Sequence, residues 1–170
     1  LRVRRGEFPE LKLPVIPGCD IAGIIEESGE RVVVYPILSC GTCGFCVEGS
    51  EHLCREIRIV GVHQDGGYAE SIVVPRANAI PVPDSLDLTE WAATPVVFLT
   101  AWHALVSRAN LRVGESILIH SVGSGLGTAA VQIASAGGAR VIVTAGTDEK
   151  LEQAETLGAH ETINYQDVDF

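Results

Sequence analysis

Four cysteines lie close together in the chain, within the run SCGTCGFCVEGSEHLC. A zinc ion takes four thiolates in a tetrahedron, and a Cys-x-x-Cys turn brings two sulfurs to one side of the ion without strain. The spacing therefore predicts a zinc-binding lobe at residues 40–54, with the ligands Cys40, Cys43, Cys46 and Cys54. Because protein sulfurs would fill all four positions, neither water nor substrate could reach the metal, and we expect this zinc to be structural.

Two disulfides are the alternative interpretation of the same cysteines. Disulfide frameworks belong mostly to small secreted domains that lack a sufficient hydrophobic core. This chain has 170 residues, of which 46% are hydrophobic, and its opening segment LRVRRGEF does not have the character of a secretion signal. The composition therefore favours zinc over disulfides and predicts a cytoplasmic protein.

The charge of the chain bears on its partners. Twenty-two acidic and twelve basic residues give a net charge of −10. Such a charge repels nucleic acid and anionic membrane surfaces. In addition, no apolar run approaches the roughly 20 residues that a membrane-spanning helix needs. We therefore expect neither nucleic acid nor a membrane as a partner.

The texture of the sequence changes near residue 84. Before that point, short β-type runs are punctuated by glycine and proline, a pattern typical of a small β-rich domain; these runs lie at residues 21–27, 31–36, 68–74 and 78–83. After it, Asp87 and Glu90 form a capping pattern, and Pro95 is expected to split or kink the helical stretch that follows. We assign residues 1–83 to the β-rich domain with the zinc lobe and residues 84–170 to linker helices and a second domain.

Strands and helices alternate in the second half. Apolar runs at 115–120 and 139–144 are followed by helical patterns at 128–137 and 148–158. This alternation indicates βαβ units with a parallel sheet. A further strand is expected to begin in ETINY, close to the last residue, and the sequence has no methionine, including at position 1. We therefore expect an incomplete Rossmann-type domain, with residues missing from both termini.

A glycine-rich turn connects the first of these strands to its helix. Glycines at such a turn let the backbone approach a pyrophosphate bound at the helix amino terminus. The candidate cofactor-binding residues are Ser121, Gly123, Ser124, Gly125, Leu126 and Gly127. The glycines at 123, 125 and 127 depart from the strict Gly-x-Gly-x-x-Gly spacing, so a purely structural packing role remains the alternative.

The end of the second strand bears on the choice between NAD and NADP. NAD enzymes carry an acidic residue there, about 20 residues beyond the turn, that binds the ribose 2′-hydroxyl. Here the sequence has the small residue Gly146 and then Thr147, and Asp148 is expected to cap the next helix. Thr147 and Lys150 leave room and positive charge for a 2′-phosphate, which favours NADP over NAD. Alternatively, Lys150 is an ordinary solvated helix residue.

Together these segments resemble the medium-chain dehydrogenase/reductase superfamily, which includes zinc-type alcohol dehydrogenases and quinone oxidoreductases. The resemblance rests on GCDIAGIIEESG, VVVYPILSCGTCGFC, DGGYAESIVVP, FLTAWHAL, VGSGLGTAAVQIA and LGAHETINY. It implies a β-rich GroES-like domain joined to an α/β Rossmann-type domain. It also implies a small-molecule carbonyl or alcohol substrate and, for the full-length protein, a homo-oligomer.

The resemblance carries some site residues over to this chain. It places the family's structural zinc at the four clustered cysteines. The family's catalytic zinc carries over only in part: the position of the Gly-His-Glu motif holds Cys19 and Asp20, which are the candidates for that site. Thr100 matches a position near the nicotinamide and is the candidate catalytic residue, although its hydroxyl can instead bond back to the preceding helical turn. His63, His103 and His120 are expected to be structural.

The sequence therefore predicts an NADPH-dependent oxidoreductase that acts on a carbonyl, enone or quinone and carries one structural zinc. One alternative is a zinc-dependent alcohol dehydrogenase with a catalytic site that contains Cys19. Another is a nucleotide-binding module without turnover. The connection at Gly29 and Glu30 is shorter than in the family. Because the second domain is expected to be incomplete, we expect residues 1–170 alone to be inactive.

Overall fold

The computed structural model describes residues 3–8 and 11–167. The chain divides into two compact units, residues 1–96 and residues 97–170. Each unit has its own β-sheet and its own hydrophobic core. Residues 84–96 lie in the first unit in this division, and the domain boundary expected at residues 83 and 84 stays a prediction.

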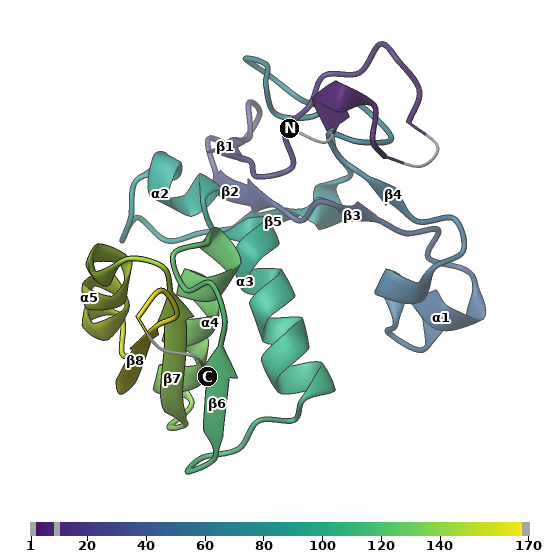
Figure 1. The fold of residues 1–170 in the computed structure, drawn as a ribbon. Helices are drawn as coiled ribbons and strands as arrows, with labels where there is room; N and C mark the ends of the chain where they lie inside the picture. The colour runs from purple at the N-terminus through teal and green to yellow at the C-terminus, as the bar shows by residue number, and fades with distance from the viewer. Residues whose placement is uncertain (1–2, 9–10, 168–170) are drawn as a thin grey trace. The chain divides into compact units, whose positions relative to one another are not determined.

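An antiparallel sheet of three short strands forms the centre of the first unit (Figure 1); its order is β1 (Ala22–Ile24), β2 (Arg31–Val34), β5 (Ala79–Pro81). Residues of β2 alternate between the two faces, so that Val32 and Val34 are buried. Val34 packs with Ile21 and Val60 in the core. These strands confirm the runs expected at 21–27, 31–36 and 78–83.

The cysteine-rich segment is held at its base by a second, two-stranded sheet. β3 (Ile37–Leu38) pairs antiparallel with β4 (Arg58–Ile59), and the chain between them contains α1 (Gly44–Val47) and a 3₁₀-helix at Glu51–Leu53. In Figure 1 this lobe projects from the first unit beyond the two strands. The sequence patterns did not predict β3 and β4, since two residues are too few for a period to be recognised.

The strand expected at residues 68–74 is wrong: these residues form neither helix nor strand. Their alternation is real, because Ile72 and Val74 pack against the core while Val73 is 92% exposed. A strand, however, also needs a neighbouring strand for its backbone hydrogen bonds. No described segment pairs with residues 68–74.

Two helices follow the first sheet. Asp87 caps α2 (Leu88–Ala92): its carboxylate accepts from the Glu90 backbone N–H at 2.8 Å, and the Glu90 carboxylate accepts from the Asp87 N–H at 3.0 Å. Pro95 is the first residue of α3 (Pro95–Trp102), a position that needs no backbone donor. The predicted cap and the split at Pro95 are therefore confirmed. A π-helix at His103–Arg108 continues from α3.

The second unit contains a parallel sheet in the order β6 (Ser116–Ile119), β7 (Arg140–Ala145), β8 (Glu161–Asn164). The crossovers contain α4 (Gly125–Ala136) and α5 (Asp148–Thr156), and Figure 1 shows α5 beside β7 and β8. Val141 and Val143 of the central strand are completely buried. The structure thus confirms the α/β Rossmann-type arrangement expected from the alternation, of which the first three strands are present.

The remaining helical segments are 3₁₀ turns at Val3–Arg5 and Arg76–Asn78. Within residues 3–8 and 11–167, no helix combines the length and the apolar character that crossing a membrane requires.

Candidate functional site

The four clustered cysteines meet in one place. Their sulfur atoms all lie within 4.8 Å of one another. Two of the separations are 3.5 Å, between Cys43 and Cys46, and 3.9 Å, between Cys40 and Cys46. Four thiolates at about 2.3 Å from one tetrahedral zinc ion would lie about 3.8 Å apart. The cluster therefore fits a zinc ion, and the sulfurs are too far apart for a disulfide; all five cysteines of the chain are free thiols.

Local backbone geometry brings the sulfurs together. Gly41 has a φ of +73°, a left-handed conformation that lets the chain turn tightly between Cys40 and Cys43. The Cys43 N–H donates to the Cys40 sulfur at 3.3 Å, and the Cys40 N–H donates to the Cys54 sulfur at 3.4 Å. Such N–H donors stabilise negative charge on metal-bound sulfur.

The same donors affect the acidity of the thiols. Hydrogen bonds from the backbone of Thr42 and Cys43 lower the pKa of Cys40 to about 6. Burial, and then the hydrogen bond with Cys43, raises the pKa of Cys46 to about 11. The lobe thus favours a thiolate, the form that binds a metal, at Cys40.

The glycine-rich turn connects β6 to α4. Ser124 is the N-cap of α4, and its hydroxyl accepts from the Gly127 N–H at 3.1 Å. The backbone N–H groups of Gly125 and Leu126, the first two residues of the helix, are not used in helical hydrogen bonds. These two groups and the positive end of the helix dipole are suited to an anion such as a pyrophosphate.

Gly127 has a packing role in this turn. A Cβ atom on residue 127 would lie 2.8 Å from the Ser121 carbonyl oxygen and 2.8 Å from the Val122 Cα. Glycine therefore lets α4 lie directly against the turn. Gly125 is less constrained, since its nearest neighbour is a methyl group of Val97 at 3.2 Å. Of the glycines predicted to bind the cofactor, Gly127 is thus required by packing.

Lys150 and Tyr165 approach this turn and the end of β7. A Cβ on Gly123 would lie 2.6 Å from Cδ of Lys150, so the aliphatic part of the lysine lies against the turn. A Cβ on Gly146 would lie 2.7 Å from the hydroxyl oxygen of Tyr165. At the carboxyl end of the parallel sheet, the Lys150 side chain thus lies beside Gly123 and the Tyr165 hydroxyl lies beside Gly146.

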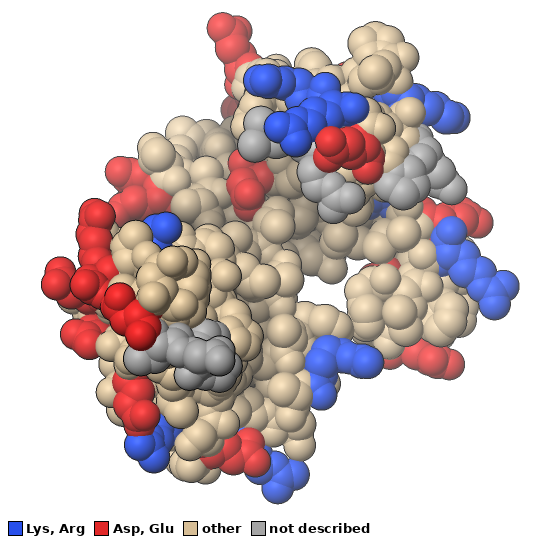
Figure 2. Space-filling model, viewed as in Figure 1, with Lys and Arg blue, Asp and Glu red and all other residues tan. Residues whose placement is uncertain are grey.

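Asp148 differs from the sequence-based expectation. Thr147 is the N-cap of α5, and Asp148 is the first residue of the helix. The Asp148 carboxylate accepts from the Asn164 side-chain amide at 2.8 Å, so it is bound to the residue that ends β8. On the face shown in Figure 2, acidic side chains gather over α5; the helix contributes Asp148, Glu149, Glu152 and Glu155.

Thr100 lies on α3, at an exposed position. Val97 of the same helix contacts the position of Gly125, and residues three apart are neighbours on a helix surface. Thr100 therefore lies about one helical turn along α3 from the residue that contacts the glycine-rich turn. Its role at the nicotinamide stays a prediction.

Cys19 and Asp20 are adjacent in the chain, but the described residues place no third potential metal ligand beside them. Burial, and then the charge of Asp20, raises the pKa of Cys19, which disfavours its thiolate. One carboxylate oxygen of Asp20 accepts from the Val96 N–H at 2.9 Å, at the beginning of α3. Across the described part of the chain, no set of three or more potential metal ligands includes either residue. The catalytic zinc site stays a prediction.

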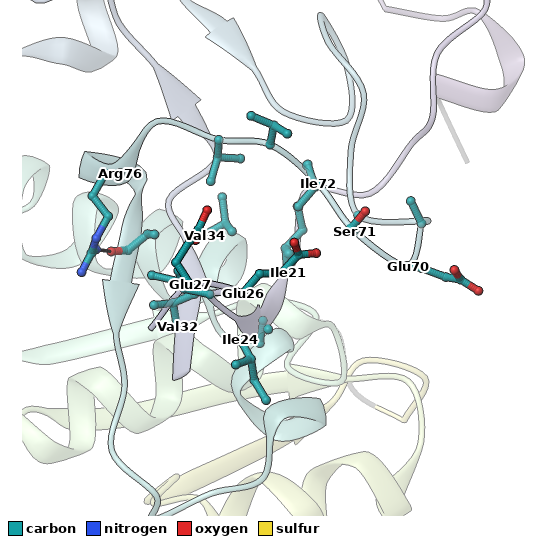
Figure 3. Close-up of a pocket in the computed structure, with 18 residues that line it drawn as sticks. Ile21, Ile24, Glu26, Glu27, Val32, Val34, Glu70, Ser71, Ile72 and Arg76 are labelled. Carbon is teal, nitrogen blue, oxygen red and sulfur yellow. Dashed lines mark hydrogen bonds between the residues drawn. The ribbon is translucent and has the colours of Figure 1, made fainter. Parts of the chain in front are cut away.

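A groove of about 630 Å³ lies in the first unit, between the β1–β2 sheet and residues 67–74. Figure 3 shows apolar side chains of Ile21, Val32 and Ile72 together with the acidic side chains of Glu26 and Glu27. None of the site residues predicted from the sequence lines this groove. It therefore shares no residue with the candidate zinc and nucleotide sites.

Sequence reasoning missed two features of the nucleotide end of the sheet. Tyr165 was seen only as part of an expected strand, and His120 was expected to be structural. In the structure, Tyr165 lies against Gly146, and His120 bonds the Thr144 hydroxyl. Each residue directly follows a strand of the parallel sheet, and this common position is the sequence signal that could have identified them.

Two protein families match the chain. The family described as "Alcohol dehydrogenase GroES-like domain" matches residues 1–84, and the family described as "Zinc-binding dehydrogenase" matches residues 125–170. The first match contains the four clustered cysteines, and the second begins at the first residue of α4. The first match therefore includes the candidate zinc site, and the second includes α4 and the residues at the ends of β7 and β8.

The chain is also similar to individual proteins. It is 37% identical to an alcohol dehydrogenase of Geobacillus stearothermophilus, over 96% of this chain and 51% of that protein. It is 34% identical to a quinone oxidoreductase of Mus musculus, over 93% of this chain and 43% of that protein. A crystal structure of an NAD-dependent alcohol dehydrogenase superposes with a TM-score of 0.93 at 44% identity, covering 97% of this chain and 51% of that one. The chain thus spans about half the length of the curated relatives it matches.

Proposed function

Because this chain belongs to the medium-chain dehydrogenase/reductase superfamily, we propose that its protein is an NADP(H)-dependent oxidoreductase. Its proposed substrates are small molecules that contain a carbonyl, enone or quinone, and its four-cysteine lobe is proposed to hold one structural zinc. The observation that carries the cofactor assignment is the placement of Lys150 and Tyr165 against Gly123 and Gly146.

The glycine-rich turn is the proposed binding site for the pyrophosphate. The N–H groups of Gly125 and Leu126 begin a helix of 12 residues, and the positive end of the helix dipole favours an anion there. Ser124 already binds the Gly127 N–H. Gly127 is therefore proposed to let the helix approach the turn, and Gly125 and Leu126 to donate to the phosphate.

The end of β7 supports NADP over NAD. A 2′-phosphate needs space, a positive charge and a hydrogen-bond donor. Lys150 provides the charge and Tyr165 a donor, and the missing side chain of Gly146 leaves room for the Tyr165 hydroxyl. Thr147, also exposed, offers a second hydroxyl. The first acidic residue after β7 in the sequence is Asp148, and one oxygen of its carboxylate accepts from the Asn164 amide.

The similar structure is that of an NAD-dependent alcohol dehydrogenase, and for this reason the choice between NADP and NAD needs a direct test. NAD recognition usually depends on a carboxylate that accepts from the ribose 2′-hydroxyl. In this chain one oxygen of the Asp148 carboxylate accepts from the Asn164 amide, and a carboxylate has further acceptor sites.

The chemistry divides between the cofactor and the chain. When bound, the nicotinamide supplies the hydride that reduces the substrate, as in other nicotinamide enzymes. Thr100 is proposed to orient the carboxamide of the nicotinamide, which the resemblance to the family implies. Thr100 lies on α3, and Val97 of the same helix touches the glycine-rich turn. Binding of the pyrophosphate and orientation of the nicotinamide would therefore be linked through α3.

The zinc proposed for the lobe has a structural role. Cys40, Cys43, Cys46 and Cys54 would hold it, and their sulfurs lie within 4.8 Å of one another, a cluster that fits a tetrahedral site. The ion would join the two ends of a segment that contains only one turn of α-helix and a 3₁₀ turn. We expect most of the order of this lobe to depend on the ion.

An alcohol dehydrogenase with a catalytic zinc is the second candidate, because relatives named alcohol dehydrogenase match the chain. Removal of hydride from an alcohol is helped by a Lewis acid that stabilises the alkoxide. The candidates for such a site are Cys19 and Asp20. Since Asp20 bonds the Val96 N–H and burial raises the pKa of Cys19, their surroundings favour this candidate less.

The test compares two nucleotides that resemble the adenosine part of the cofactor, one with the 2′-phosphate and one without it. Titration calorimetry of the chain with adenosine 2′,5′-bisphosphate and with AMP compares the 2′-phosphate with the plain ribose, because both carry a single 5′-phosphate. We expect the bisphosphate to bind about tenfold more tightly, and Lys150→Ala to remove that difference. Lys12→Ala, a change of the chain's other lysine at an exposed position, is the matched control.

Equal affinity for the two nucleotides would contradict the NADP assignment and favour NAD. Lack of binding of both, in a chain that retains its melting transition, would contradict the proposed nucleotide site altogether.

A further inference from the structure

Ser121 has an unusual backbone conformation. Its φ is +54°, in the left-handed region that residues with a side chain rarely adopt. It occupies the first position of the turn, and its carbonyl oxygen accepts from the Ser124 N–H at 2.9 Å. Strained residues of this kind persist only where the surrounding structure holds them, and they cluster at functional sites. What holds Ser121 is therefore informative about the turn.

Both neighbours of Ser121 bond the same residue of β7. On one side, Nδ1 of His120 lies 3.3 Å from the Thr144 hydroxyl. On the other, the Val122 N–H donates to the Thr144 carbonyl oxygen at 3.0 Å. One residue of the neighbouring strand thus anchors the chain immediately before and immediately after the strained position.

The sheet itself makes this arrangement possible. Ile119 lies opposite Val143 in the parallel register, so His120 comes next to Thr144 one position further on. Thr144 is 1% exposed, and a buried hydroxyl requires a hydrogen-bond partner. The imidazole of His120 satisfies this requirement from the end of β6.

A movement of Ser121 would reach the proposed phosphate site. The Ser121 carbonyl accepts from the Ser124 N–H, and Ser124 caps α4 by accepting from the Gly127 N–H. The same carbonyl lies close to the Cα of Gly127, where a Cβ would be at 2.8 Å from it. If Ser121 relaxed to the right-handed region, its carbonyl would rotate. Ser124, the cap of α4, would then lose its hydrogen bond to this carbonyl, and Gly127 would lose its contact with it.

We propose that His120 and Thr144 are positioning residues of the nucleotide site: their side-chain hydrogen bond holds Ser121 in its left-handed conformation, so that the N–H groups at the start of α4 point to the pyrophosphate. This inference rests on the proposed nucleotide-binding function. Neither side chain needs to touch the ligand. His120 is thus a part of the site, beyond the structural role expected from the sequence.

Isosteric variants test the proposal. Thr144→Val removes the hydroxyl and keeps the shape, whereas Thr144→Ser keeps the hydroxyl. We expect Thr144→Val to weaken the binding of ADP by about fivefold, the effect of one hydrogen bond, and Thr144→Ser to change it less than about twofold. Thr162→Val is the matched control, because that threonine lies on β8 and bonds Glu155 instead of the turn.

A rescue experiment separates positioning from a general loss of packing. Glycine adopts a positive φ without strain, so Ser121→Gly removes the need for the hydrogen bond. In the Ser121→Gly background, Thr144→Val should weaken ADP binding by less than about twofold. A His120→Leu and Thr144→Val double variant should bind ADP no more weakly than either single variant, because both remove the same bond.

Amide exchange at Val122 gives a measurement that needs no nucleotide. In the ligand-free chain, Thr144→Val and His120→Leu should each speed exchange of this N–H about fivefold, whereas Thr162→Val should not. Unchanged exchange and unchanged affinity in Thr144→Val would overturn the inference, and so would an effect that Ser121→Gly fails to reduce. If the unaltered chain binds neither ADP nor adenosine 2′,5′-bisphosphate, the proposed function is wrong, and so is the nucleotide part of this inference. The exchange rates at Val122 still decide whether His120 and Thr144 hold the turn.

Discussion

The hydroxyl oxygen of Tyr165 lies 2.7 Å from the point where a Cβ of residue 146 would be, so the tyrosine that follows β8 requires a glycine at the end of β7. Real Cβ atoms do not approach other atoms so closely. Because β7 and β8 are adjacent parallel strands, the two residues meet where the proposed 2′-phosphate would bind. The glycine is thus explained by a residue nearly twenty positions away.

Gly146→Ala should displace the Tyr165 ring. Tyr165 is 45% exposed and its ring can move outward, so we expect a loss of less than about 1 kcal/mol in unfolding free energy. Affinity for adenosine 2′,5′-bisphosphate should fall several-fold, because the phenol no longer faces the phosphate. Calorimetry measures this loss. Gly23→Ala is the control, since a Cβ there meets nothing within 4 Å; equal affinity in both variants would contradict the role of Tyr165.

Gly127→Ala and Gly125→Ala should differ in stability. At residue 127 the added Cβ meets backbone atoms of Ser121 and Val122 at 2.8 Å, and backbone cannot move aside cheaply. We expect a loss of about 1–3 kcal/mol. At residue 125 the nearest atom is a side-chain methyl at 3.2 Å, so the change should stay within about 1 kcal/mol. Urea unfolding of the two variants measures the difference, and equal losses would argue against the packing role of Gly127.

Removal of one clustered cysteine should abolish zinc binding. We expect one zinc per chain by native mass spectrometry, and none in Cys43→Ser, because three thiolates bind the ion much more weakly than four. Cys19→Ser is the control and should keep its zinc. Two ions in the unaltered chain, with one remaining in Cys43→Ser, would instead support the catalytic site at Cys19.

The capping box of α2 should make stability depend on pH. The Glu90 N–H, which donates to the Asp87 carboxylate, lowers the pKa of Asp87. A group whose pKa is lower in the folded state stabilises the fold above its unfolded pKa, about 3.9 for aspartate. This contribution is lost as the pH falls through the lower, folded value. The melting temperature should therefore fall in acid partly because of this residue.

Asp87→Asn isolates that contribution. Asparagine still caps the helix but does not ionise, so the melting temperature of this variant should fall less between about pH 5 and about pH 3 than that of the unaltered chain. Any zinc released by acid is lost from both proteins and cancels in the comparison. An equal fall in both proteins would contradict the assignment, and Asp167→Asn serves as the control for removal of one surface charge.

Ser121→Gly should stabilise the chain. The left-handed conformation costs a residue with a Cβ roughly 1–2 kcal/mol, and glycine avoids this cost, although it also makes the unfolded chain more flexible. We expect a net gain of about 0.5–1 kcal/mol in urea unfolding. Asn110→Gly, at a φ of +52°, should gain less, because asparagine tolerates this region better than serine. A loss of stability in Ser121→Gly would show that the serine side chain contributes more than its strain costs.

Much of the fold follows from local patterns. Alternating strands and helices at 115–158 predicted β6, α4, β7 and α5 within a few residues of their observed bounds. Asp87 and Glu90 predicted the cap of α2 because both partners lie within one helical turn. The same reasoning failed at 68–74, where the alternation is present but no described strand pairs with it.

The four-cysteine cluster was determined by the sequence alone, because short spacings leave the sulfurs few ways to be far apart. Lys150 was also identified from its distance to the glycine-rich turn. Only the tertiary structure decided which glycines and side chains meet at the end of the sheet: Gly146 with Tyr165, and His120 with Thr144. These pairs depend on the register between strands that lie about 20 residues apart in the chain, and no local pattern of residues records that register.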